Sequence, residues 1–210
     1  INIRCLWLRS NQLNIIKTID YKKLLELVCN NCELENIEDI NYLTNLTKLS
    51  CINTNITDVS KLVNLTELRC DNTKITDVSK LLKLKQLHCS NTSIDNIRDL
   101  IHLTSLHCNN TNICFINNLS NLEYLECINT PIKCIINQLN LKSIRCDNSK
   151  IRYIKNEGGR CWSKIHNQGI RETESQYVIL SAWRSRPKVE HFQKVFDNLN
   201  NGFAFVDLCL

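Results

Sequence analysis

The residues Leu68-Arg69-Cys70-Asp71-Asn72-Thr73-Lys74-Ile75 form a phrase that returns, in close variants, every nineteen residues through the middle of the chain. A period of this length leaves room for one strand and one return segment in each repeat. A single repeat of that size has no core of its own, so successive repeats are expected to stack into a solenoid and bury each other's apolar side chains. The cysteine of each copy marks the interval: Cys51, Cys70, Cys89, Cys108, Cys127 and Cys146.

Each repeat opens with a short segment of alternating character, in which Leu68 and Cys70 are expected to point inward and Arg69 outward. This period of two predicts a strand, and stacking the repeats predicts a parallel ladder of strands along one face. Early spacings of 21 and 22 residues, before the period settles at nineteen, indicate that the first two coils are looser. About eight coils are expected, with strand anchors at Leu6, Leu27, Leu49, Leu68, Leu87, Leu106, Leu125 and Ile144.

After each strand the chain is expected to turn at an asparagine, such as Asn72, because a short amide side chain tolerates unusual backbone dihedrals and bonds to nearby backbone groups. The threonine that follows, Thr73, is expected to point inward and to satisfy buried backbone with its hydroxyl. Ile56, Val59 and Leu62 are then spaced by three, which predicts a tight turn or 3₁₀-like return rather than a full α-helix. The face opposite the strands is therefore expected to consist of short returns, with gentle curvature of the whole stack.

This pattern resembles the leucine-rich repeat family. The strand consensus of that family, Leu-x-x-Leu-x-Leu-x-x-Asn-x-Leu, is met here with Cys at the third Leu position and Thr at the Asn position, and the Asn one position earlier is expected to form the ladder instead. Ile-Thr-Asp-Val-Ser-Lys-Leu at residues 56–62, repeated at 75–81, is similar to a shortened internalin-type return. The resemblance implies an α/β repeat solenoid over residues 1–154. The abundance of Asn, Ile and Lys is also similar to proteins from AT-rich genomes, such as those of amoebal giant DNA viruses and some protists.

The periodicity stops after Ile154, so residues 155–210 are expected to form a separate, α-helical C-terminal capping region. A pattern typical of a capping box at residues 173–176 precedes an apolar run at 177–180, and apolar residues share one helical face at 187–199. Residues 203–206 resemble a terminal strand. Two helices and a strand are therefore expected to cover the open end of the solenoid, which would otherwise expose apolar core and an unpaired edge.

Two alternatives concern the ends of the chain. The C-terminal region is expected, in the alternative, to dock a partner through aromatic side chains, namely Trp162, Trp183 and Phe192. No matching cap is visible before Ile1, so the first strand is expected to leave an edge open to self-association.

Composition and charge exclude several functional classes. The net charge of +5 over 210 residues forms no concentrated basic stripe, which argues against binding to nucleic acid. No run of eighteen apolar residues predicts a membrane helix. With four glycines in the chain, phosphate-cradling loops are nearly excluded, and no cofactor is expected. No nucleophile lies beside an oriented base, apart from a weak grouping of Cys161, His166 and His191, so the chain is not expected to be an enzyme.

Most of the thirteen cysteines occupy one apolar position of the repeat and are therefore expected to act as small core residues. Parallel side chains on neighbouring coils fit the torsion of a disulfide poorly. Free thiols are therefore expected, which points to a reducing compartment, the cytoplasm, or the host cytosol if the protein is viral.

The outward residues of the strands form a varied face of mixed charge, which suits a protein partner better than a polyanion. His88 and His107 occupy one position of adjacent coils, with Glu126 one coil further, but ordinary exposed histidines are favoured over a metal site because no fourth ligand is evident. The leading hypothesis is a non-catalytic module that binds a protein of unknown identity on this face. The alternatives are an adaptor, such as a ubiquitin-ligase substrate receptor docked through the C-terminal region, and a thiol-based metal or redox sensor. Aromatic and arginine side chains dominate interface energies, and the expected contact residues are Trp7, Arg69, His88, His107, Tyr124, Glu126 and Arg145.

Overall fold

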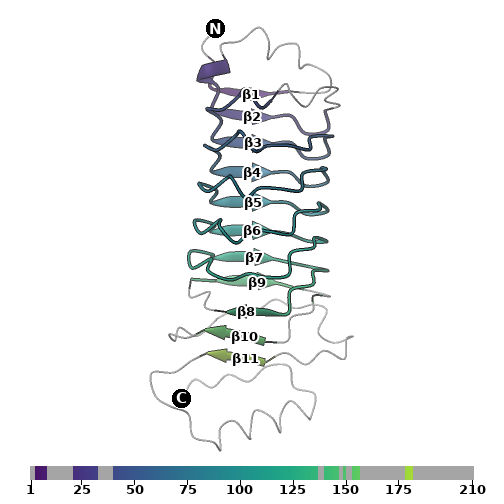
Figure 1. The fold of residues 1–210 in the computed structure, drawn as a ribbon, viewed down its shortest axis with the longest axis vertical. Coiled ribbons are helices and arrows are strands. Elements are labelled where there is room, and N and C mark those ends of the chain that lie inside the picture. The colour runs from purple at the N-terminus through teal and green to yellow at the C-terminus, as the bar shows by residue number, and fades with distance from the viewer. Residues whose placement is uncertain are drawn as a thin grey trace, which may run out of the picture.

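The chain winds into a stack of coils with one short strand at each level (Figure 1). The computed structural model describes residues 3–8, 21–32, 40–136, 140–146, 149, 153–156 and 178–181. An eight-stranded parallel sheet runs along one side, in the order β1-β2-β3-β4-β5-β6-β7-β9. Its strands are β1 (Cys5–Trp7), β2 (Glu26–Val28), β3 (Lys48–Ser50), β4 (Glu67–Arg69), β5 (Gln86–His88), β6 (Ser105–His107), β7 (Tyr124–Glu126) and β9 (Ser143–Arg145).

The register of this sheet places equivalent repeat positions directly beside one another. Leu68 pairs with Leu49 on one side and with Leu87 on the other, and the same row continues from Leu6 to Ile144. Every anchor from Leu27 onward is buried, whereas Leu6 is partly buried against the same core. The strands predicted for the repeats and their inward residues are confirmed. The register is constant because a slip by one residue would turn the inward residues of a strand toward solvent.

The cysteines that follow the strands lie in this core. Cys51, Cys70 and their equivalents are buried as small apolar residues. The threonine three residues after each cysteine bonds to the cysteine's backbone. The Thr73 hydroxyl donates to the carbonyl of Cys70 at 2.7 Å, and every coil from Thr54 to Thr130 has the equivalent bond. The predicted inward threonine, bonded to buried backbone, is confirmed. Burial also raises the pKa of the thiols of Cys51, Cys70, Cys89, Cys108 and Cys127, and it raises the pKa of Cys29 to about 12.

The asparagines between cysteine and threonine adopt the left-handed backbone conformation that the turn requires. Asn72 has a φ of 57°, and Asn31, Asn53, Asn91, Asn110 and Asn129 are alike. Their side chains form a ladder along the edge of the stack: Asn72 Nδ2 donates to Asn53 Oδ1 at 2.7 Å, and Asn91 Nδ2 donates to Asn72 Oδ1 at 2.8 Å. The asparagine ladder expected one position early is therefore present.

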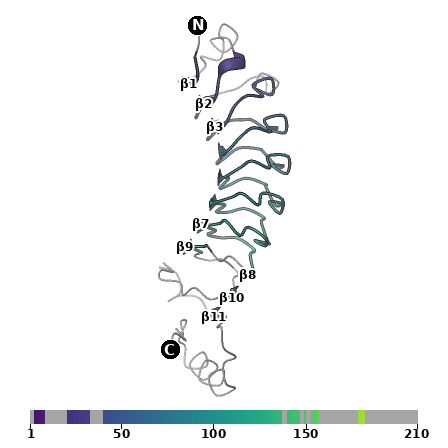
Figure 2. The same cartoon turned by 90° about the vertical axis from the view of Figure 1, so that its left-hand side faces the viewer.

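The returns lie on the side opposite the strands (Figure 2), and the strand edge of the stack is only gently curved. In the third coil, Leu62 N donates to Val59 O and Leu65 N donates to Leu62 O, both at 3.0 Å, so two 3₁₀-type turns follow each other without forming a continuous helix. Asp58 begins this bend, because its carboxylate accepts a hydrogen bond from Ser60 N at 2.8 Å. A short 3₁₀ helix, η2 (Tyr21–Lys23), precedes β2.

A second sheet on the return side was not predicted. It contains β8 (Cys134–Ile136), β10 (Tyr153–Asn156) and β11 (Val178–Ser181) in the order β11-β10-β8, all parallel. The cause is visible at one repeat position. The early coils place Asp58, Asp77 and Asn96 there, and each bends the chain through a side-chain bond to a backbone N–H two residues on. Later coils place Phe115, Cys134 and Tyr153 there, which have no such acceptor and sit beside isoleucines, so the return becomes extended.

This sheet corrects the expectation for the C-terminal region. Residues 178–180, expected at the start of a helix, form a strand that pairs with β10. The expected boundary after Ile154 falls inside β10. No α-helix occurs in the residues that the structure describes, and the remaining parts of the expected cap, 157–177 and 182–210, lie outside them. Among the described residues, no helix has the length and apolar character needed to span a membrane.

Candidate partner-binding face

The strand face consists of two rows of outward side chains, because each of these three-residue strands buries its middle residue and leaves its two end residues partly or fully exposed. The sheet register aligns both rows across coils. The first row is Cys5, Glu26, Lys48, Glu67, Gln86, Ser105, Tyr124 and Ser143. The second row is Trp7, Val28, Ser50, Arg69, His88, His107, Glu126 and Arg145, which holds every predicted contact residue except Tyr124.

A hollow of about 290 Å³ occupies the N-terminal half of this face. Trp7, which is 71 % exposed, and Arg69 both line it, with Val28 and Ser50 between them in the second row. The structure thus brings two predicted contact residues, distant in sequence, to the same concavity. The other lining residues are Glu26, Leu27, Asn30, Lys48, Leu49 and Glu67.

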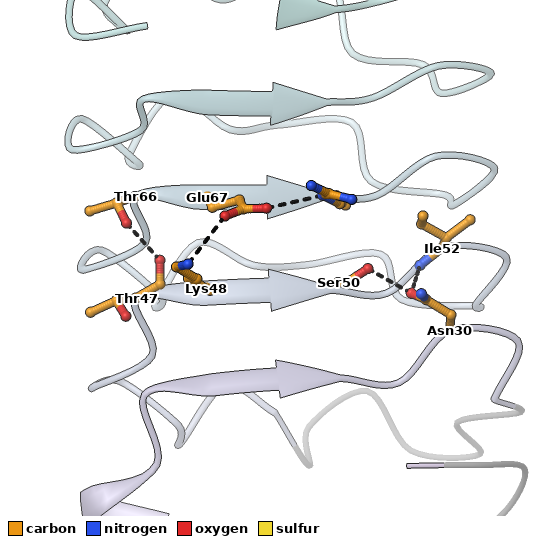
Figure 3. A network of polar contacts seen from close by, with 8 residues as sticks. Asn30, Thr47, Lys48, Ser50, Ile52, Thr66 and Glu67 are labelled. Carbon is orange, nitrogen blue, oxygen red and sulfur yellow. Dashed lines mark hydrogen bonds and ion pairs between the residues drawn. The ribbon is translucent and has the colours of Figure 1, made fainter. Parts of the chain in front are cut away.

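Glu67 holds the charged side of the hollow together (Figure 3). Its carboxylate lies 3.0 Å from Arg69 Nε through Oε1 and 3.7 Å from Lys48 Nζ through Oε2. At the other end of the strands, Asn30 Oδ1 accepts hydrogen bonds from Ser50 Oγ at 2.8 Å and from Ile52 N at 2.9 Å. These contacts fix the orientation of the polar side chains before any partner arrives.

A continuous polar chain occupies the C-terminal half of the second row. The rings of His88 and His107 are stacked, with centroids 4.1 Å apart and planes 8° from parallel. His107 Nδ1 lies 3.2 Å from Glu126 Oε2, and Arg145 Nη1 lies 3.7 Å from Glu126 Oε1. Asn109 Nδ2 donates to Glu126 Oε1 at 2.8 Å. Four of the predicted contact residues therefore form one connected row.

Two features of this row bear on its chemistry. Burial, the neighbouring His107 and the Arg69 guanidinium hold the pKa of His88 below its usual value, so the imidazole is neutral at pH 7. Among the residues that the structure describes, no group of three or more His, Cys, Asp or Glu side chains is placed to hold a metal ion.

Tyr124 lies on the first row, 48 % exposed, between Ser105 and Ser143 of the neighbouring strands. Sequence reasoning named it for its aromatic ring but did not select Glu67 or Asn109, which orient the named arginines and acids. The signal for Glu67 was present, because residues two apart on a strand share one face. The Asn109–Glu126 bond joins neighbouring strands diagonally and has no comparable sequence signature.

The return side carries exposed apolar residues of its own. Val63, Leu82 and Ile101, which occupy one repeat position, are each about half exposed. Nearby, in the fifth and sixth coils, the Arg98 guanidinium lies 5.2 Å from the centroid of the Phe115 ring, which is 46 % exposed. This arginine–aromatic pair supplies a chemical match to Arg69 and Tyr124 on the opposite side of the stack.

Comparison with known proteins agrees with the repeat pattern. Residues 44–83 match the family model described as leucine rich repeats in two copies. A search of curated proteins found no match. Among solved structures, internalin C2 from Listeria monocytogenes is 27% identical, with a TM-score of 0.54, over 60% of this chain and 62% of that one.

Two further structures from Listeria monocytogenes are similar. The functional domain of InlJ, described as including a cysteine ladder, is 25% identical with a TM-score of 0.55, over 76% of this chain and 35% of that one. Internalin InlF, 22% identical with a TM-score of 0.55 over 79% of this chain and 56% of that one, supports the fold alone. The chain thus spans between 35% and 62% of the length of these three structures.

Proposed function

We propose that this chain, in which residues 44–83 match leucine-rich repeats, is a non-catalytic module that binds a protein partner on its strand face. Leucine-rich repeat proteins in general act in protein–protein interaction. The observation that carries the proposal is the connected row of His88, His107, Glu126 and Arg145, which continues the row of side chains that holds Trp7 and Arg69 at the hollow. Arginine and aromatic side chains of this kind supply most of the energy in protein interfaces.

The charge of the face supports a protein partner rather than a polyanion. Acidic Glu67 and Glu126 alternate with basic Arg69 and Arg145, and each acid already contacts a base. A surface with balanced, fixed charges favours a partner with complementary charges of both signs. Nucleic acid and membrane surfaces, which need an excess of basic groups, are not the partners we propose.

The proposal is tested by removing two contacts from the strand face. The double variant Arg69→Ala/Tyr124→Ala, immobilised and exposed to a cell lysate, is expected to lose the partner that the wild type captures, as measured by quantitative mass spectrometry. The matched control is Arg98→Ala/Phe115→Ala, which removes the same residue classes from the return side and is expected to retain that partner. Equal capture by the strand-face variant and the wild type, with both folded by circular dichroism, contradicts the proposal.

The alternative proposal is an adaptor, with the solenoid holding one protein and residues 155–210 docking a larger complex such as a ubiquitin ligase. Deleting residues 160–210 separates this role from a capping role. A cap predicts that the shortened chain aggregates or melts earlier, because β10 loses its neighbour β11. A docking element predicts a soluble solenoid that keeps its strand-face partner and loses a second one.

We also propose that the protein works in a reducing compartment such as the cytoplasm, with its thiols reduced. None of the ten cysteines whose side chains the structure describes forms a disulfide, and eight of them are buried. Intact-mass measurement after alkylation under native and unfolding conditions tests this: disulfides in protein isolated without reductant contradict it. Self-association through the edge of β1, and the viral or protist origin, remain predictions from the sequence.

A further inference from the structure

The stacked pair of His88 and His107 lies in the middle of the strand face, between the hollow and the Glu126–Arg145 pair. The two residues are direct register partners in β5 and β6, which holds their rings face to face at 4.1 Å. Such a stack is compatible with two neutral rings or with one charged ring. It is disfavoured when both rings are protonated, because two positive charges would then lie at van der Waals distance.

The groups around the pair come from β4, β7 and β9 and from the turns that follow β4 and β6. The pKa of His88 is lowered chiefly by the burial of its ring, then by His107 and by Arg69 of β4. Glu67 of β4, and Asp71 just after that strand, act in the opposite direction. Asp71 is engaged elsewhere, since its Oδ1 accepts a hydrogen bond from Ser90 N at 2.8 Å. Glu67 is likewise held by Arg69. Both acids therefore oppose the lowered pKa of His88 without reversing it.

On the other side of the pair, Glu126 from β7 lies against His107, and Arg145 from β9 lies against Glu126. Asn109 donates to the same carboxylate. Glu126 is thereby fixed to His107 and does not extend to His88. The two rings of the stack consequently have different electrostatic surroundings: an acid contacts His107, and a guanidinium neighbours His88.

We propose that this pair links partner binding to pH: the partner binds the form in which His88 is neutral, so its affinity falls as acidification protonates the stack. The inference rests on the proposed function of the strand face. The stack is only half-buried in the free protein, and a protein seated over it excludes the remaining water. Removing water disfavours the charged imidazole further, so binding and protonation of His88 oppose each other.

The free protein provides the first test. The ¹H–¹³C resonances of the His88 and His107 rings, followed from pH 8 to pH 5 by NMR, are expected to give a titration midpoint for His88 below the usual histidine value. In the His107→Gln variant this midpoint is expected to rise, because the charge of the neighbouring ring is gone. A His88 midpoint that does not respond to His107→Gln overturns the coupling on which the proposal depends. Because it needs no partner, this readout does not depend on the proposed function.

The second test uses the partner isolated through the strand face. Its Kd, measured by titration calorimetry between pH 7.5 and pH 5.5, is expected to weaken by up to about tenfold per pH unit for each linked proton. His88→Gln, which cannot titrate, is expected to flatten this dependence. The control is His102→Gln, which removes an exposed histidine on the return side and is expected to leave the dependence intact.

The outcomes distinguish failure of the pH linkage from failure of the proposed binding function. Capture of a partner with the same Kd at both ends of the pH range overturns the linkage and leaves the proposed function standing. A Kd that tightens on acidification also overturns it, because the partner then supplies a carboxylate to the pair. If the strand-face variant never affects capture at any pH, the proposed function fails and the linkage fails with it.

Discussion

Replacing Leu87 with alanine is expected to lower the free energy of unfolding by about 3–5 kcal/mol. Leu87 is the buried middle residue of β5, is 0% exposed, and lies between Leu68 and Leu106 of the neighbouring strands. The substitution removes three carbon groups, which at roughly 0.8 kcal/mol each accounts for about 2.4 kcal/mol of lost burial. The cavity left between two fixed coils adds the remainder, because strands paired on both sides cannot collapse into it.

Leu82→Ala is the matched control, since it is the same substitution five residues away at a side chain that is 52 % exposed. It is expected to cost no more than about 0.5–1 kcal/mol. Urea unfolding followed by far-UV circular dichroism measures both variants, with equal m-values required before the midpoints are compared. A difference of less than about 1 kcal/mol between the two variants would show that the inward and outward positions of the repeat are wrongly assigned.

Three other predictions follow from single contacts. Asn72→Gly loses the two ladder bonds but keeps the left-handed backbone, whereas Asn72→Ala loses the two bonds and also disfavours that backbone conformation. The alanine variant is therefore expected to be less stable than the glycine variant by about 1–2 kcal/mol in urea unfolding, and equal urea midpoints would contradict the role of the φ angle. Among the described cysteines, exposed Cys5 is expected to be alkylated first in the native protein at pH 8, whereas Cys70, Cys89 and Cys108 react only after unfolding, because burial raises their thiol pKa; peptide mapping that finds them modified early is the contrary outcome. The pKa of Asp77 is lowered chiefly by its bond from Ser79 N, so the stability it contributes is present above about pH 4 and lost as pH falls through the lowered pKa; the wild type is therefore expected to exceed Asp77→Ala in stability by more at pH 7 than at pH 3, and a gap that does not narrow in acid would contradict this.

The repeat rows could be predicted because a single variable, the nineteen-residue period, determines them. Once Leu68 is inward, Leu49 and Leu87 follow, and Asn72 and Thr73 occupy fixed places relative to the strand end. The stacked histidines were likewise placed side by side by the period alone. The register between short parallel strands follows from the sequence spacing. The positions of the inward leucines, the turn residues and the histidine pair therefore depend little on side-chain conformation.

The features that were missed depend on local competition between side chains. The second sheet forms where Cys134 and Tyr153 replace residues whose oxygen bends the earlier returns, and Phe115 at the same position precedes an isolated bridge from Ile116 to Ile135. Whether a return bends or extends depends on the balance between one side-chain hydrogen bond and the β-propensity of the residue at this position. A consensus averaged over all repeats does not show that the residue changes in the later coils. The hollow beside Trp7 depends on how side chains from the first four strands pack together, which repeat spacing does not specify.

The strand face as the docking surface is tested most directly by NMR shift mapping of the complex with the captured partner. Binding is expected to shift the side-chain resonances of Trp7, His88, His107 and Tyr124, and to leave the methyl groups of Val63, Leu82 and Ile101 on the return side unchanged. Shifts confined to those return-side methyl groups, with an unperturbed histidine pair, would contradict the account.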